Sequence, residues 1–361
     1  MNSRDILNKY LYPGFDQNVR RKSFPKYDTL AIATGQTDYY FFQTALGNQY
    51  LRNTRLPLSG TEVFFINEIS MVLRVNITTV ALMNNFNEMM QQGFLQISVD
   101  NRVQCKLPIL DFLEYSVPDF LTATGTAVLP EISLGKRKLP IPIILNSTSA
   151  FEFRLVIPTA SATAFNTQTI QLVLHGLQLD KLDSFYWDNL KNNQFQQIPV
   201  TYYNTQAIAN GNETVYPFFS NPAQAPGLLS QTFPLSDIQT FSLQNFEVYI
   251  GNADTPIEGT TQYFSSLQKL LRISIDDIDF YNAISQDMLS IVSMFSTTLT
   301  TTPDTVSLNV IHVRNSKTLP VPLEFPANSK VIITLAQPAS SLPVTGDITI
   351  ALRGIETRRV A

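Results

Sequence analysis

The sequence contains little cysteine, histidine or charge. A single cysteine, Cys105, occurs in 361 residues, which excludes a disulfide scaffold and a cysteine-rich metal site. The two histidines, His175 and His312, leave little material for acid–base chemistry or for zinc binding. The sequence has no glycine-rich phosphate loop, Gly-x-Ser-x-Gly elbow or metal-binding pair of histidines. We therefore expect no enzyme, with no catalytic residues, no cofactor and no metal site.

Charged residues make up 15% of the chain, against about 25% in an average domain. The net charge of -4 argues against direct binding of nucleic acid over the whole surface. Hydrophobic residues reach 44% and aromatic residues 11%, which a disordered chain does not have. The length is sufficient to bury two cores side by side. The composition therefore indicates a folded protein that is poor in charge.

Long hydrophobic runs are also missing. Apolar stretches such as Leu139–Leu145 are far shorter than the roughly 18–20 residues that cross a membrane. The first ten residues, Met1–Tyr10, lack the apolar core of a signal peptide. We expect a protein that is made and kept in the cytoplasm, or released by lysis rather than by secretion.

The chain contains an internal repeat. Leu139–Ile143 (LPIPI) recurs as Leu319–Leu323 (LPVPL), 180 residues later. Three further pairs follow the same order at offsets between 176 and 180 residues: Leu56–Ser59 with Phe233–Ser236, Leu95–Asp100 with Leu271–Asp276, and Ile170–Gly176 with Ile348–Gly354. Four collinear matches with small drift are what loop-length changes between two diverged copies produce. The sequence therefore predicts a duplicated domain.

Each copy has the pattern of an antiparallel β-sandwich. Short segments that alternate between apolar and polar residues, such as Phe151–Ile157, are separated by clusters of proline, asparagine or glycine. One helix per copy is expected, at Leu82–Gln92 and near Gln262–Leu271. Seven or eight short strands with few glycines favour the long connections of a jelly roll. The fold class is therefore all-β, with two tandem antiparallel jelly-roll sandwiches and one or two short helices per copy.

The predicted domain boundaries follow from the repeat. Residues 1–55 form a basic N-terminal arm and a lead-in strand, and residues 56–182 form the first jelly roll. Residues 183–232 form a connection, with a short amphipathic helix at Asp183–Leu190 and a polar surface loop at Gln194–Pro234. Residues 233–361 form the second jelly roll.

Few residues invite a chemical role. His175 stands where the second copy has Arg353, an exchange that suits a polar strand end facing solvent. His312 and Cys105 are expected to be ordinary strand residues. The acidic group Asp276–Asp279 is either a calcium site or a solvated turn, and the first copy has Asp100-Asn101-Arg102 there, which weakens the calcium interpretation. No catalytic, cofactor or metal site is therefore assigned.

The start of the chain is basic. This segment is expected to contact either an anionic membrane surface or acidic groups of a neighbouring chain, and direct contact with nucleic acid is the less favoured interpretation. The candidate contact residues are Arg4, Lys9, Arg20, Arg21, Lys22 and Lys26.

The duplicated strands resemble a known family. Leu139–Pro158 with Leu319–Pro338, and Ile170–Gly176 with Ile348–Gly354, make the chain similar to the double jelly-roll major capsid proteins of icosahedral viruses with an internal membrane. The resemblance covers about residues 56–353. In length and compact loops the chain is similar to members from lipid-containing bacteriophages, such as the single-stranded-DNA phages of flavobacteria.

The resemblance implies a structural role in a virion. Three chains would form a homotrimer, a pseudo-hexameric capsomer that tiles an icosahedral shell over an internal membrane. The partners would be the chain itself, neighbouring trimers, the membrane and minor capsid proteins. Assembly would take place in the host cytoplasm, and the basic N-terminal segment would face the lipid.

Two alternatives remain open at this stage. A carbohydrate-binding β-sandwich would stack sugars on exposed aromatic side chains, although the single Trp187 and the missing signal peptide argue against it. The candidate stacking residues are Tyr202, Tyr203, Tyr216, Phe218 and Phe219. A minor virion component, such as a spike or penton protein, is the second alternative, and a tandem pair of jelly rolls disfavours it.

Overall fold

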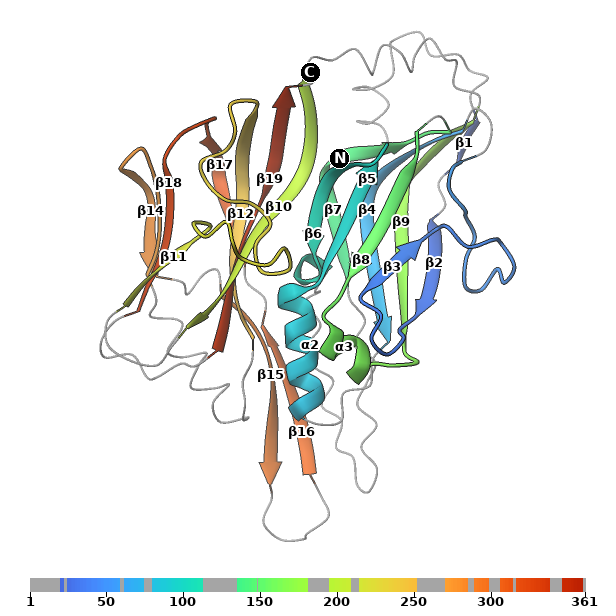
Figure 1. Cartoon of the computed structure of the whole chain (residues 1–361), viewed down its shortest axis with the longest axis horizontal. Coiled ribbons are helices and arrows are strands. Elements are labelled where there is room, and N and C mark those ends of the chain that lie inside the picture. The colour runs from blue at the N-terminus through green and yellow to red at the C-terminus, as the bar shows by residue number, and fades with distance from the viewer. Residues whose placement is uncertain are drawn as a thin grey trace.

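The computed structural model describes residues 20–22, 25–58, 62–74, 80–112, 135–147, 149–180, 195–208, 214–251, 270–284, 289–298, 306–313, 316–337 and 346–359. Two β-sandwiches stand side by side along the long axis of the molecule, with their strands running roughly across that axis (Figure 1). Strands β2 and β3 lie at one end of this axis, and β11 and β14 lie at the other.

The first sandwich consists of two sheets. One sheet has the order β2-β9-β4-β7, and β1 extends β2 along the edge of β9. The other has the order β3-β8-β5-β6. The strands are β1 (Arg20–Lys22), β2 (Lys26–Ala31), β3 (Asp38–Phe41), β4 (Val63–Arg74), β5 (Phe94–Val99), β6 (Arg102–Pro108), β7 (Lys136–Leu145), β8 (Phe151–Val156) and β9 (Thr169–Asp180).

The second sandwich repeats this arrangement. Its sheets have the orders β10-β19-β12-β17 and β11-β18-β13-β14. The strands are β10 (Phe195–Ile208), β11 (Thr214–Phe218), β12 (Gln239–Gly251), β13 (Leu270–Ile275), β14 (Ile278–Ile284), β17 (Lys317–Phe325), β18 (Val331–Gln337) and β19 (Gly346–Arg359). Within each sandwich every pairing is antiparallel. Strand β2 pairs with β9 and β3 with β8, and in the same way β10 pairs with β19 and β11 with β18. This is the jelly-roll topology in both copies, so the predicted fold class is confirmed.

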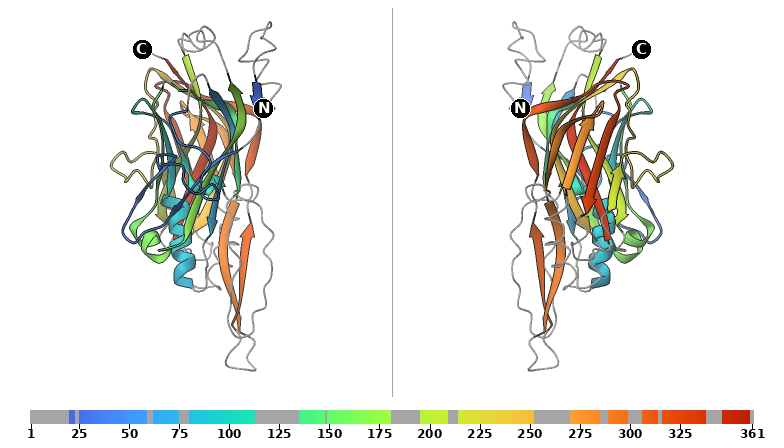
Figure 2. Two further views of the ribbon diagram at one scale, coloured as in Figure 1. Left: turned by 90° about the vertical axis from the view of Figure 1, so that its right-hand side faces the viewer. Right: turned by 90° about the vertical axis from the view of Figure 1, so that its left-hand side faces the viewer.

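Helices and one hairpin complete the described chain. Helix α2 (Val80–Gln92) lies before β5, as the sequence predicts, α3 (Thr159–Ala164) lies between β8 and β9, and a 3₁₀ turn, η1 (Ile109–Phe112), follows β6. The hairpin of β15 (Leu289–Thr298) and β16 (Val306–Val313) pairs with β12 through β15 and extends beyond the sandwiches (Figures 1 and 2). No helix among the described residues is long and apolar enough to cross a membrane.

The two copies match at the level of single backbone features. Leu56-Pro57 and Phe233-Pro234 are both cis peptide bonds. Asp100 and Asp276 both open a tight β-hairpin at positive φ. Such agreement at unusual conformations supports duplication beyond what strand alternation alone provides.

Two glycines mark an equivalent bulge in each copy. Gly176 in β9 and Gly354 in β19 both lie opposite a register shift in the neighbouring strand. A Cβ atom on either glycine would overlap a backbone carbonyl oxygen, that of Phe65 or of Ser242. Because only glycine allows this close approach, the bulge explains why both copies keep a glycine there.

The structure corrects the expected connection between the copies. The segment Gln194–Pro234, expected as a surface loop, contains β10 and β11, which pair with β19 and β18. In the same way β1, β2 and β3 belong to the first sandwich's sheets. Each sandwich therefore begins before the boundaries at residues 56 and 233 that the sequence suggested.

The remaining expectations about helices have mixed outcomes. The expected helix Asp183–Leu190 lies outside the described residues. Of the expected helix Gln262–Leu271, the last two residues, Leu270 and Leu271, belong to strand β13, and the rest lies outside the described residues. A short apolar run fits either a helix or a strand, so the helical spacing of apolar residues in this segment did not reveal the strand at its end.

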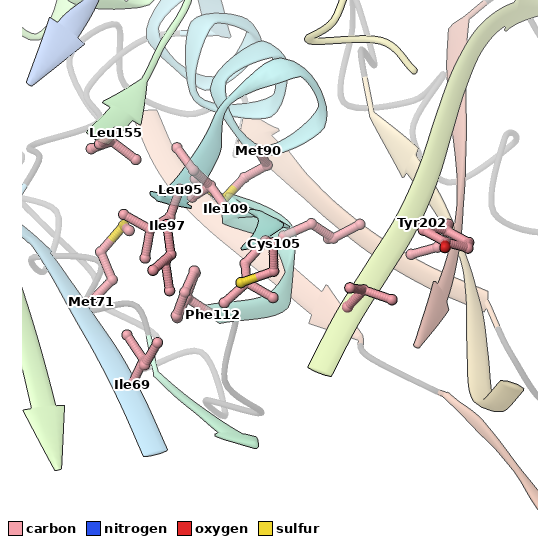
Figure 3. Close-up of a cluster of buried hydrophobic side chains, with 14 of the residues drawn as sticks. Ile69, Met71, Met90, Leu95, Ile97, Cys105, Ile109, Phe112, Leu155 and Tyr202 are labelled. Carbon is pink, nitrogen blue, oxygen red and sulfur yellow. The ribbon is translucent and has the colours of Figure 1, made fainter. Parts of the chain in front are cut away.

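One cluster of buried apolar side chains includes both sandwiches. Figure 3 shows its part near the junction, where Ile69, Ile97 and Phe112 of the first sandwich lie on one side and Tyr202 of the second on the other. Cys105 lies between these groups. The sandwiches are therefore joined by continuous packing.

Candidate functional site

In the described part of the chain, the contact between the two sandwiches combines buried charges, hydrogen bonds and apolar packing. We call it the junction: β6, β7, η1 and the end of α2 from the first sandwich, against β10, β12 and β19 from the second. Side chains of strand β10 contact both sandwiches. Tyr202 packs on Phe241 within the second core, and Tyr203 packs on Phe94 of the first sandwich, with ring centroids 4.4 and 6.4 Å apart.

Three charged side chains are buried together at the junction. The guanidinium of Arg353 in β19 donates to Asp111 of η1 at 2.6 Å and to Glu247 of β12 at 2.5 Å. Asp111 also accepts a hydrogen bond from the Thr201 hydroxyl at 2.5 Å, and Arg137 of β7 lies 3.5 Å from it. This ionic cluster thus joins elements of both sandwiches.

Electrostatics hold the ionic cluster in its charged form. Burial alone would lower the pKa of Arg353, but the carboxylates of Asp111 and Glu247 outweigh it and raise that pKa above its ordinary value. Burying such a group without partners costs several kcal/mol, roughly 3–5 when one partner of a buried pair is removed. The cluster therefore fixes how the two sandwiches meet, because a shifted contact would leave charges unpaired.

Neutral hydrogen bonds add to the junction. The Gln91 side chain donates to the Asp347 carbonyl at 2.9 Å, and the Gln91 carbonyl accepts from the Thr205 hydroxyl at 3.2 Å. The Tyr249 hydroxyl donates to Asn87 of α2 at 2.9 Å, and Arg358 donates to the Val103 carbonyl at 3.1 Å. These bonds come from α2 and from β6, so the two sandwiches are hydrogen-bonded at several separate places.

Two hollows in the described part of the chain differ in size. A cleft of about 80 Å³ at the junction is lined by Cys105, Glu356 and Arg358 among others, which is smaller than the roughly 300–1,000 Å³ of small-molecule sites. A wider hollow of about 500 Å³ at the loop end of the first sandwich is lined by Arg55, serines and apolar groups. Neither brings together a catalytic set of side chains.

The Cys105 thiol is inert. It is buried in β6, as expected for a small strand residue, and burial raises its pKa to about 12. His312 lies in strand β16, also as expected.

The expectation for His175 and Arg353 is wrong in an informative way. Both residues lie inside long strands, and Arg353 is 3% exposed rather than facing solvent. His175 is half-buried, and its Nε2 lies 2.8 Å from the Ser70 hydroxyl. Burial lowers the pKa of His175, Glu68 opposes this and Lys136 adds to it.

The repeat relates these two pairs to each other. Ser70 and His175 stand in the first sandwich where Glu247 and Arg353 stand in the second, at offsets of 177 and 178 residues. The first copy has a neutral pair at these positions, whereas the second copy has an ion pair that lies at the junction. The sequence signal for this site is the difference between the two copies at these equivalent positions, which are neutral in the first copy and charged in the second.

The acidic group at Asp276–Asp279 forms a hairpin turn. The Asp276 carboxylate accepts a hydrogen bond from the Lys330 backbone at 2.9 Å, Asp277 pairs with the Lys330 ammonium, and Asp279 pairs with Arg272. In the first copy Asp100 accepts from the Ala150 backbone at 2.8 Å. Each carboxylate has a basic or backbone partner, which favours the turn interpretation. Across the described residues, no group of three metal-ligating side chains occurs.

The basic arm is only partly described. Arg20, Arg21 and Lys22 form β1 beside β9, whereas Arg4 and Lys9 lie outside the described residues. Lys26 is 4% exposed, with its ammonium 5.1 Å from the centre of the Phe64 ring. This buried position does not offer the Lys26 charge to a membrane or a neighbouring chain.

The aromatic residues proposed to stack sugars are mostly buried. Tyr202, Tyr203, Phe218 and Phe219 are each exposed by 4% or less, and Tyr216 is partly buried. Their rings belong to the core and the junction. The carbohydrate-binding alternative therefore loses the side chains on which it rests.

Comparison with known proteins gives only structural matches. The sequence matches no model of a protein family, and no curated protein matches it. Over 96% of both chains, the structure is similar to PBCV-1 VP54, as fitted into a reconstruction of the virophage Sputnik, with a TM-score of 0.47 and 8% identity. A quasi-atomic model of the PBCV-1 virus capsid gives 0.43 and 9%, also over 96% of both chains. The STIV MCP gives 0.43 and 11%, over 94% of this chain and 96% of that one.

Proposed function

We propose that this chain is a major capsid protein, a structural subunit of an icosahedral virus shell. The observation that carries this proposal is the tandem pair of jelly rolls, identical in topology and joined by a buried junction. A block of two similar, tightly packed domains suits a building unit. The described residues present no catalytic constellation that would suggest chemistry instead.

The duplication allows three chains to form a six-sided unit. Cyclic oligomers repeat one contact patch around an axis. Three copies of a chain with two similar sandwiches place six similar units around that axis, and a six-sided block tiles a surface with neighbours on every edge. We propose that the chain forms such a homotrimer, as the resemblance of its sequence implies.

The low charge of the chain supports broad contacts between subunits. Interface cores are depleted in charged residues, and only 15% of this chain is charged. We further propose that the arm around β1 faces an internal membrane or a neighbouring chain through Arg20, Arg21 and Lys22. The site of action would then be the virion, after assembly in the host cytoplasm.

Light scattering on the purified chain tests the oligomeric part of this function. The expected mass is three times the 40.5 kDa of the single chain. Raising the protein concentration or adding anionic vesicles should then yield larger closed particles in the same measurement. A protein that stays at the single-chain mass under all of these conditions would contradict the proposal.

A further inference from the structure

The two sandwiches expose equivalent surfaces to different degrees. In the first sandwich β6 and β7 lie against β10 of the second. Their equivalents in the second sandwich are β14 and β17. Strand β14 lies at the end of the molecule away from the first sandwich (Figure 1), and β17 pairs with β12 on the side of the sheet away from β10. Among the described elements, the main neighbours of β14 and β17 are their ladder partners β13 and β12. The surface that one copy buries within the chain is therefore left open in the other.

Single residues show the same difference. Ile141 in the LPIPI segment of β7 is 7% exposed, whereas its repeat equivalent Val321 is 75% exposed. Phe94, which packs on Tyr203 at the junction, is 5% exposed, whereas its equivalent Leu270 is 36% exposed. These equivalent positions remain apolar in the second copy although solvent reaches them.

Three large apolar side chains make up this open surface. It is defined by Leu270 in β13, Phe280 in β14 and Val321 in β17. Phe280 is 52% exposed. Large exposed apolar side chains on a folded chain indicate a contact with another protein. We call these three residues the donor surface.

A second surface, at the opposite end of the molecule, corresponds to the other side of the junction. At the junction the first sandwich receives β10, whose equivalent in the first sandwich is β2. Tyr203 in β10 is fully buried, and its equivalent Tyr27 is only partly buried. The loop beside β2 exposes Leu46, Tyr50 and Leu51, with Tyr50 82% exposed. We call β2 and this loop the acceptor surface.

In the second sandwich, the loop equivalent to the one beside β2 already makes such a contact within the chain. Gly227, the repeat equivalent of Tyr50, lies so close to the end of α2 that a Cβ atom on it would come within 2.8 Å of the Gln92 carbonyl oxygen. The loop of the second sandwich therefore touches the first sandwich at the junction. The equivalent loop of the first sandwich carries a large exposed side chain instead.

We propose that the donor surface of one copy docks onto the acceptor surface of a second copy and so repeats the junction between chains. This inference rests on the proposed function and names the surfaces through which the subunits meet. The contact is heterologous, because two different surfaces meet, and such contacts form a ring when the rotation closes. Leu270 of one copy would take the place of Phe94, and Tyr27 of the next copy the place of Tyr203.

The contact between chains would differ from the junction in its polar part. The ionic cluster uses Arg353 and Thr201 of the second sandwich, and the first sandwich has His175 and Pro25 at those positions. The repeated contact therefore depends on apolar packing rather than on buried ion pairs. An apolar donor surface is also the part that a single charge disrupts most.

Charge substitution on the donor surface tests the proposal. The double variant Phe280→Asp with Val321→Asp should keep the circular dichroism of the parent chain but run at the 40.5 kDa mass of one chain. Val215→Asp is the matched control, since Val215 is 56% exposed in β11, at the other edge of the same sheet. The control should assemble like the parent.

The outcomes separate this inference from the proposed function. A parent chain that assembles, together with a double variant that assembles equally well, would overturn the donor surface and leave the shell function standing. A parent chain that is monomeric throughout would contradict both.

Cross-linking identifies the pairing of the surfaces. In Tyr27→Cys with Leu270→Cys, a short bismaleimide should join chains into dimers and trimers on a denaturing gel. Cys105 is buried and is expected not to react. Tyr27→Cys with Val215→Cys should remain at one chain. Efficient cross-linking of Leu270→Cys alone would overturn the heterologous arrangement, because it requires two donor surfaces to face each other.

Discussion

Arg353 and His175 occupy equivalent places in the two sandwiches, yet their surroundings differ. Arg353 is held by Asp111 and Glu247 at the junction, whereas His175 contacts the Ser70 hydroxyl. Sequence alone indicates that both positions are polar, but it does not indicate burial, because burial comes from the other sandwich. The partner Asp111 stands far away in the sequence, and no local pattern links it to Arg353.

Removing the Arg353 guanidinium should destabilise the chain strongly. Arg353→Ala removes the guanidinium that pairs with the buried carboxylates of Asp111 and Glu247, and we expect it to lower the free energy of unfolding by roughly 3–5 kcal/mol. Arg272→Ala removes the exposed pair with Asp279 and should cost about 1 kcal/mol or less. Urea unfolding of both variants measures the difference. Equal effects would contradict the structural role of the ionic cluster.

The Cys105 thiol should be silent in the folded chain. Burial and a pKa of about 12 keep it protonated and shielded at neutral pH. A chromogenic disulfide reagent should therefore detect no thiol in the native protein and one thiol per chain after unfolding in urea. Rapid reaction of the native protein would show that β6 is accessible from the junction cleft.

His175 should make stability depend on pH. Burial lowers its pKa in the folded chain, so the unfolded chain binds the proton more readily and stability falls as pH drops below about 6.5. The His175→Gln variant should lose less unfolding free energy than the parent between about pH 7.5 and pH 5.5. Identical pH profiles for the two proteins would contradict this.

At the scale of elements, the strands with clear alternation were predictable and β10 was not. Its polar run and Pro199 are typical of a loop, but β10 is an edge strand, where a proline is tolerated. Pairing with β19 along its whole length makes it a strand. The helix at Val80–Gln92 was predictable, because apolar spacing and the following Gly93 agree.

The paired bulges give an element-level prediction. Gly354→Ala places a methyl group against the Ser242 carbonyl and should lower the free energy of unfolding by about 1–3 kcal/mol through overpacking. Gly47→Ala is the control, since a Cβ there meets nothing within 4 Å. Thermal unfolding of the two variants provides the comparison. A Gly354→Ala protein as stable as the control would mean that the bulge relaxes freely.

At the scale of the whole molecule, the duplication was readable because it leaves collinear matches in the sequence. The junction was not, because a contact between domains has no motif and draws its residues from distant elements such as η1 and β19. The exposed surface of the second sandwich that corresponds to the junction is found only by comparing equivalent residues of the two copies in the structure. The asymmetry between a covered and an open surface is the basis of the proposed contact between chains.

The central claim is that this chain is a shell subunit with near-sixfold shape, and imaging of the purified protein by negative stain tests it most directly. The account predicts particles of three chains with a six-sided outline, in which each side corresponds to one sandwich. Single two-lobed particles, without any larger assembly, would contradict it.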